Sequence, residues 1–149
     1  MIRADQFEDY VAISEVKARY CRFLDTKQWA DWGDLFTDDF ELDTRPSGGT
    51  LTHGREEALR IVRESIETAK TAHQVHSPEM QIDGDSARVV WAMQDRVVWD
   101  EQRAAEIGIA GLTGYGHYTE RYVRENGRWR IAAQTLSRLH MDVHPFSPA

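Results

Sequence analysis

Residues 112–140, LTGYGHYTERYVRENGRWRIAAQTLSRLH, hold two strand-like segments around a hairpin dipeptide. Asn-Gly favours a tight two-residue turn because both residues tolerate positive φ, which matches the twist of the flanking strands. Alternating side chains and many aromatic and β-branched residues are typical of strands on either side of such a turn. We therefore predict that residues 112–124 and 128–140 pair as an antiparallel hairpin.

A second hairpin is predicted just upstream, where Asp83-Gly84 separates strands over residues 75–82 and 87–99. Asp-Gly has the same turn preference as Asn-Gly. Residues 100–111 are polar and rich in Ala and Gly, so they are expected to connect the two hairpins. The second half of the chain is therefore predicted to supply four strands.

The first half has the spacing of helices. Apolar residues three or four apart predict helices over residues 7–24 and 58–69, with a short helix containing Trp29, Trp32, Leu35 and Phe36 between them. Residues 43–54 hold one Pro and three Gly and are predicted to form a loop. Helices followed by strands indicate an α+β domain, with one curved antiparallel sheet and helices enclosing a pocket.

Composition narrows the function classes. The 149 residues suit a single domain, and 25 acidic against 18 basic residues give a net charge of −7. No basic block is present, which argues against binding nucleic acid or an anionic membrane. The acidic start, Met1–Tyr10, and the lack of long apolar runs predict a cytoplasmic protein. The single Cys21 excludes an intrachain disulfide and is predicted to be a packed thiol.

Asp95 is the least expected residue of its strand. Alternation places it on the apolar face, with Trp91 and Trp99 four residues away on either side. A carboxylate there is costly unless it is paired or protonated, so it is a structural partner of a buried Arg, a bulge residue or a site residue. Arg138, in the last strand, shares its parity with Arg130 and is exposed unless the strand bulges between them.

His73, Tyr20 and Asp25 are further candidates. His73 and His76 face opposite ways on a strand, so a two-His metal site is not expected, but one of them can serve as a general base. Asp25 follows the first helix and either caps the next helix, with Gln28 completing a capping box, or belongs to a site. Tyr20 points at whatever the first helix packs against.

Three segments resemble a known family. AISEVKARYCRFLDTKQWADWGDLFTDDF (12–40), AHQVHSPEMQIDGDSA (72–87) and GYGHYTERYVRENGRWRI (114–131) are similar to the SnoaL-like domains of the nuclear transport factor 2-like superfamily. The resemblance covers residues 8–140 and implies a cone-shaped α+β fold around a pocket. Within the superfamily, the bile acid 7α-dehydratases are the most similar and the scytalone dehydratases are more distant.

The dehydratase resemblance implies a site. Tyr20 and Asp25 match a Tyr and an Asp near the end of the first helix, and His73 matches the His that opens the first long strand. Asp95 matches the Asp of a W-x-x-x-D stretch, and Arg138 matches an Arg late in the last strand. The implied enzyme is a cofactor-independent and metal-independent dehydratase that acts on a bulky apolar carbonyl compound, steroid-like or polycyclic.

In that mechanism His73 removes a proton, Asp25 orients its imidazole and Tyr20 donates a hydrogen bond to the developing enolate oxygen or to the leaving hydroxyl. Asp95 is expected as a protonated acid, and Arg138 as a ligand for an anionic or oxygenated part of the substrate. Two alternatives stay open: an isomerase or polyketide-type cyclase in the same pocket, and a non-catalytic binder. The resemblance also implies a homo-oligomer, with a trimer favoured and a dimer possible.

Overall fold

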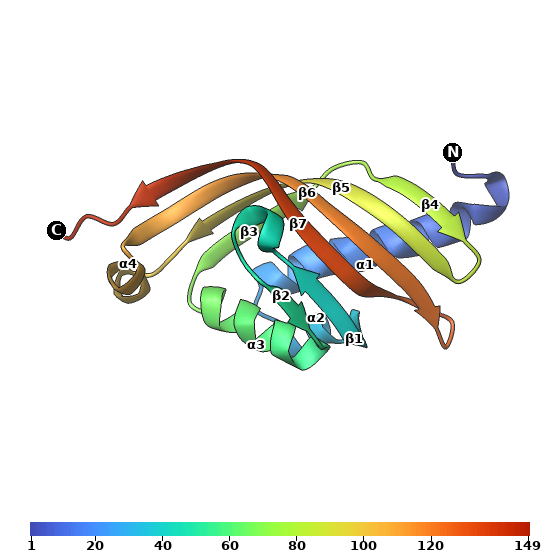
Figure 1. Ribbon diagram of the computed structural model, residues 1–149, viewed down its shortest axis with the longest axis horizontal. Coiled ribbons are helices and arrows are strands. Elements are labelled where there is room, and N and C mark those ends of the chain that lie inside the picture. The colour runs from blue at the N-terminus through green and yellow to red at the C-terminus, as the bar shows by residue number, and fades with distance from the viewer.

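Figure 1 shows a computed structural model of the protein, which describes residues 1–149. The α-helices are α1 (Phe7–Asp25), α2 (Trp29–Gly33), α3 (Arg55–Ile66) and α4 (Glu101–Ile107), and the 3₁₀ turns are η1 (Ala4–Gln6) and η2 (Arg45–Ser47). The strands are β1 (Phe36–Asp43), β2 (Leu51–His53), β3 (Lys70–Val75), β4 (Glu79–Asp83), β5 (Ser86–Val98), β6 (Ile109–Glu125) and β7 (Arg128–Pro145).

The strands form one open, curved sheet in the order β2-β1-β7-β6-β5-β3, with β4 also paired to β5. Both predicted hairpins are confirmed: β4 pairs with β5 across Gly84, and β6 pairs with β7 across Asn126 and Gly127. Asn126 and Gly127 both have positive φ, 51° and 76°, as their turn requires. The predicted α+β class is confirmed. One pair departs from the antiparallel pattern, because β1 runs parallel to β7.

The segment after α2 differs from the prediction. The short helix ends at Gly33, and Phe36 is the first residue of β1. The helix-like spacing of Trp29, Trp32 and Phe36 led to the wrong prediction that Phe36 belongs to the helix. The predicted loop over residues 43–54 contains η2 and β2. The parallel pairing of β1 with β7 joins residues about ninety positions apart, for example Phe36 with Ile131. A pattern confined to residues 29–42 carries no information about that partner.

The strand predicted over residues 75–82 is divided between two strands, because Val75 is the last residue of β3 and residues 79–82 belong to β4. β3 ends at Val75 and β4 begins at Glu79, with Pro78, which has no N–H to donate, between them. Both strands pair with β5, at its opposite ends. The connection predicted over residues 100–111 contains α4, whose first turn is capped by the Asp100 carboxylate accepting from the Arg103 N–H at 3.1 Å.

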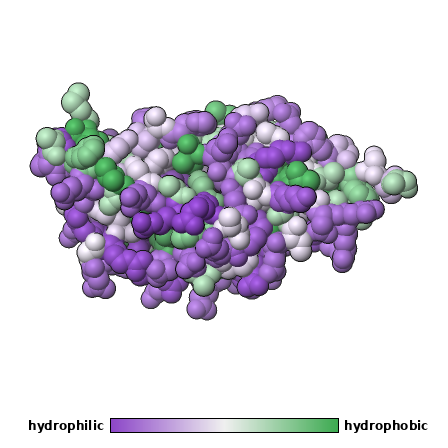
Figure 2. All heavy atoms as spheres, turned by 180° about the vertical axis from the view of Figure 1, so that it is seen from behind, coloured by the Kyte–Doolittle hydropathy of each residue, from purple (hydrophilic) through white to green (hydrophobic).

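The core lies between the sheet and the helices. Apolar residues of α1, α2, α3 and the strands form one buried cluster, which includes Ile13, Leu24, Trp32, Phe36 and Val89. Figure 2 shows the molecule from behind the view of Figure 1, and polar residues cover most of that face, with smaller apolar areas among them. None of the helices is both long and apolar enough to cross a membrane.

Candidate active site

A cavity of about 270 Å³ lies between the curved sheet and helices α1 and α3. Its walls are largely apolar, with Trp32, Phe40 and Leu112 among them. Four of the five predicted site residues line it, namely Tyr20, His73, Asp95 and Arg138. The fifth, Asp25, lies against His73. The fold therefore brings the whole predicted set to one place, although the residues span 118 positions of the chain.

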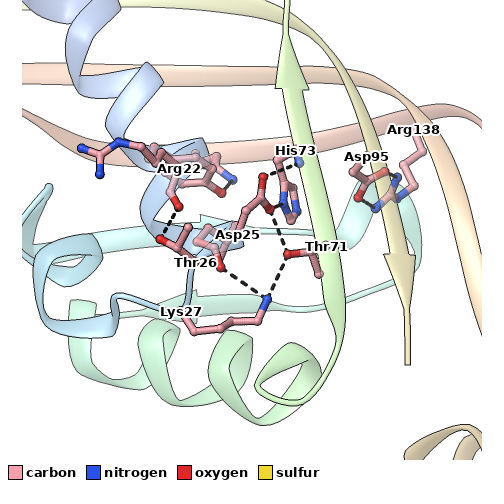
Figure 3. A network of polar contacts seen from close by, with 11 residues as sticks. Arg22, Asp25, Thr26, Lys27, Thr71, His73, Asp95 and Arg138 are labelled. Atoms are coloured by element: carbon pink, nitrogen blue, oxygen red, sulfur yellow. Dashed lines mark hydrogen bonds and ion pairs between the residues drawn. The ribbon is translucent and has the colours of Figure 1, made fainter. Parts of the chain in front are cut away.

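His73, which lines the cavity, forms a dyad with Asp25 behind it (Figure 3). The His73 Nδ1 lies 2.6 Å from Asp25 Oδ1, and the other carboxylate oxygen accepts the His73 backbone N–H at 2.8 Å. An ionised carboxylate only accepts hydrogen bonds, so Nδ1 carries the imidazole proton. In the neutral imidazole, Nε2 is then the nitrogen without a proton, and it is the one able to take up a proton from a bound molecule.

Of the two alternatives for Asp25 at the end of α1, the structure shows the contact with His73, and the capping box is not formed. The N-cap of α2 is Gln28, and no side chain caps that helix. Burial raises the pKa of Asp25, but hydrogen bonds from the His73 ring, the His73 backbone and the Thr71 hydroxyl outweigh burial and lower it below its ordinary value. Asp25 therefore remains a carboxylate at neutral pH.

Two residues that no sequence motif indicates hold Asp25 in place. The Thr71 hydroxyl donates to Asp25 Oδ1 at 2.9 Å, and the Lys27 ammonium donates to the Thr71 oxygen at 2.9 Å (Figure 3). Lys27 adopts positive φ, 59°, where the chain leaves α1. Partial burial lowers the pKa of Lys27. No local pattern indicates this relay, because Thr71 and Lys27 lie on different elements.

A second ion pair joins Asp95 of β5, which is buried, to Arg138 of β7, which is partly buried. The guanidinium donates to both carboxylate oxygens at 2.8 Å, the bidentate arrangement typical of a charge-assisted Arg–carboxylate pair. The hydrogen bond to Asp95 raises the pKa of Arg138 despite burial. Of the alternatives for Asp95, the structure shows the partner of a buried arginine. The expected role as a protonated acid does not fit this geometry.

A bulge in β7 turns Arg138 toward the cavity. Arg121 pairs with Ala133 and the next residue, Tyr122, with Ile131, so Ala132 is an extra residue in β7. Ile131 and Ala132 are consequently both buried. The bulge reverses the parity of the strand, so Arg130 bonds to Asp34 at the surface while Arg138 faces inward.

Gly114 of β6 makes room for this ion pair. A Cβ placed on Gly114 would overlap Arg138 Nη1 and Asp95 Oδ1, and it would lie 2.9 Å from Arg138 Cζ. Gly114 is the register partner of Asp95, so the pair crosses directly over its bare backbone. A glycine inside a strand is a signal of close approach, and it could have indicated this position.

Tyr20 of α1 is almost fully buried and is one of the residues that line the cavity. Its oxygen accepts a hydrogen bond from Gln134 Nε2 at 3.1 Å, which leaves the phenol proton available to a bound molecule. Burial raises the pKa of Tyr20, so the hydroxyl remains protonated at neutral pH. Gln134 was not predicted as a site residue. It faces inward for the same reason as Arg138, because of the bulge at Ala132.

His76 and Cys21 are not part of the dyad. His76 is exposed just beyond β3, and no group of three or more His, Cys, Asp and Glu side chains is placed to hold a metal ion. Cys21 is half-buried, and burial raises its thiol pKa to about 11, as suits a packed thiol.

Comparisons with known proteins agree with this fold. The model of the SnoaL-like domain family matches residues 5–135. A Gibberella zeae protein named "Probable cyclase FGR4" is 27% identical over 138 residues, covering 86% of this chain and 89% of its own.

Solved structures superpose closely. One from Novosphingobium aromaticivorans, named "Putative Scytalone Dehydratase", has a TM-score of 0.80 and 19% identity and covers 97% of both chains. A hexachlorocyclohexane dehydrochlorinase from Novosphingobium barchaimii has a TM-score of 0.76 and 17% identity, covering 97% of this chain and 98% of its own. At these identities the structures show a shared fold, and the resemblance to bile acid 7α-dehydratase stays a prediction.

Proposed function

The chain belongs to the SnoaL-like domain family, and from that premise and the site geometry we propose that it is a cofactor-independent lyase, a dehydratase of neutral cyclic ketones. The observation that carries the proposal is the His73–Asp25 dyad in the wall of a mostly apolar cavity. A dyad with one free ring nitrogen is a general base, and an apolar cavity binds a carbon skeleton.

In the proposed reaction, His73 Nε2 takes the proton from the carbon next to the substrate carbonyl. The Tyr20 hydroxyl donates a hydrogen bond to the oxygen on which negative charge develops. The C–H electron pair then forms the new C=C bond as the C–O bond to the β-hydroxyl breaks. The protonated His73 returns its proton to the departing hydroxyl, which leaves as water, and the dyad regains its first state.

The charges of the cavity favour an uncharged substrate. Asp95 neutralises Arg138, so the cavity has no free cation to bind a carboxylate or phosphate. This replaces the expected anion-binding role of Arg138, whose remaining N–H groups are still able to donate to a neutral oxygen. A cavity of about 270 Å³ is slightly smaller than most small-molecule sites, which measure about 300–1,000 Å³. It suits a bicyclic ketone, whereas a steroid would extend through the mouth.

The test compares wild type with His73→Ala on hydroxylated bicyclic ketones and 3-oxo steroids, using mass spectrometry to detect loss of water. His76→Ala is the matched control, because His76 is an exposed histidine outside the cavity. We expect His73→Ala to reduce turnover by about 10²- to 10⁴-fold and the control to retain it. Full turnover in His73→Ala would show that His73 is not the base.

A second candidate is an isomerase or cyclase in the same pocket, favoured by the relative named as a cyclase. The names dehydratase and dehydrochlorinase among the fold neighbours denote eliminations and support the first candidate. Product analysis separates them, because an isomerase or cyclase that returns the proton to carbon changes the nuclear magnetic resonance spectrum of the product without loss of water. A non-catalytic binder would bind the same ketones equally well in His73→Ala and turn over none. The predicted homo-oligomer, trimer favoured, and the cytoplasmic location stay predictions.

A further inference from the structure

A buried ion pair lies directly behind the wall of the cavity. Lys17 of α1 is fully buried, and its ammonium donates to Glu120 Oε1 of β6 at 2.6 Å. The Tyr122 hydroxyl donates to the other carboxylate oxygen at 2.6 Å. These three residues do not line the cavity, and the proposed mechanism does not use them. Their presence in the core therefore needs a separate explanation.

The Lys17 ammonium lies between two tyrosine rings of the cavity wall. Its nitrogen is 3.8 Å from the ring centroid of Tyr20 and 3.9 Å from that of Tyr118. The two centroids are 5.9 Å apart and the ring planes meet at 65°. A cation is attracted to the face of an aromatic ring, and more strongly when water is excluded. Lys17 thus contacts both tyrosines from the side away from the cavity.

Stability alone does not account for this arrangement. Removing two charges from water is costly, and apolar side chains of similar volume often give an equally or more stable fold. Lys17 is also surrounded by the apolar core that α1 shares with the sheet. A side chain such as methionine would fill its place without the desolvation cost. The pair contributes something else, and the rings it touches belong to the site.

We propose that Lys17, held by Glu120 and Tyr122, is a positioning residue for the Tyr20 hydroxyl. The ammonium fixes the ring of Tyr20 from behind, while Gln134 fixes its oxygen. Glu120 and Gln134 are register partners on β6 and β7, so one place in the sheet holds both ends of the phenol. The inference rests on the proposed function for the use of that hydroxyl, but it is testable without turnover.

The experiment measures how strongly the cavity prefers a ketone over its hydrocarbon. 1-Tetralone and tetralin have the same two rings and differ in one carbonyl, and the fluorescence of Trp32 and Trp99 in the cavity wall reports their binding. Four proteins form a cycle: wild type, Tyr20→Phe, Lys17→Met/Glu120→Leu, and the triple variant. Val89→Ala is the control, because Val89 is fully buried in the core but does not line the cavity.

In wild type we expect tetralone to bind about fivefold more tightly than tetralin, as one hydrogen bond would provide. Tyr20→Phe and Lys17→Met/Glu120→Leu should each abolish the preference, and the triple variant should lose no more than either. Val89→Ala should keep it. A double variant that folds and retains the preference overturns the proposal, and so does a wild type that shows none.

Two further measurements apply if the double variant does not fold or if a substrate is known. If the double variant does not fold, Tyr122→Phe takes its place, because it removes one hydrogen bond to Glu120 and keeps the ring. An unchanged preference for tetralone over tetralin in Tyr122→Phe would overturn the proposal, and a reduced preference would support it. Where a substrate is known, kcat should fall about tenfold in the double variant with KM nearly unchanged. A chain that binds as expected but turns nothing over would refute the proposed function and leave the positioning role standing.

Discussion

Replacing Gly114 with alanine should separate the Asp95–Arg138 pair. The three atoms nearest to a Cβ at this position all belong to those two side chains, so the methyl group is accommodated only if the ion pair opens. The Asp95 side chain is 4% exposed and that of Arg138 is 17% exposed. Water cannot easily solvate the separated carboxylate, and the fold loses stability.

The magnitude follows from these exposures. Breaking a buried pair costs about 3–5 kcal/mol, and the partial access of Arg138 to water places this case at the lower end, about 3 kcal/mol. Alanine inside a strand recovers roughly 0.5–1 kcal/mol relative to glycine. The net loss in the free energy of unfolding is therefore about 2 kcal/mol. For a domain of this size it lowers Tm by about 4–8 °C.

Thermal unfolding followed by circular dichroism measures this loss, and a mutant cycle tests its cause. In an Asp95→Ala/Arg138→Ala background the methyl group meets no ion pair. Gly114→Ala should there be neutral or raise Tm by a few degrees. If Gly114→Ala costs the same in both backgrounds, the strain lies in the backbone of β6 and the reasoning from the ion pair is refuted.

Two other predictions concern titratable groups of α1, the Cys21 thiol and the Asp25 carboxylate. Burial raises the thiol pKa of Cys21 to about 11, so about one thiol in a thousand is ionised at pH 8. A disulfide reagent should therefore label Cys21 slowly in the native protein and quickly in urea. Fast labelling of the native protein would contradict this. The folded-state pKa of Asp25 is lowered, so its contribution to stability is complete above its ordinary value near 3.9 and disappears as pH falls through the lower folded value. Urea unfolding of Asp25→Asn should therefore lose less stability below pH 4 than wild type, and identical acid profiles would contradict the assignment.

The local patterns were sufficient for the elements with strong local signals. α1 and α3 follow from apolar spacing, and both hairpins follow from two dipeptides, because helix periodicity and turn chemistry act within a few residues. β1 was missed because its identity depends on pairing with β7. Its parallel partner Ile131 lies far along the chain, and no property of residues 36–43 specifies it.

Among the site residues too, local patterns indicate the orientation of some side chains and not of others. The resemblance implied five site residues, and the fold brings four of them to one cavity and the fifth against His73, while alternation correctly put Asp95 on the inner face. Alternation also predicted Arg138 on the outer face, unless a bulge intervened. The extra residue Ala132 is that bulge, and nothing in the strand pattern announces it, since a bulge is defined by the partner strand.

By itself the sequence determined the α+β class, the two hairpins, the helices α1 and α3 and the types of side chain available for chemistry. Only the tertiary structure decided which charges meet. It pairs Asp25 with His73, Asp95 with Arg138, and Lys17 with Glu120 across 103 positions. Helix and turn preferences are properties of neighbouring residues. The state of a buried charge depends on the few ångströms around it, which distant segments fill only after the sheet has formed.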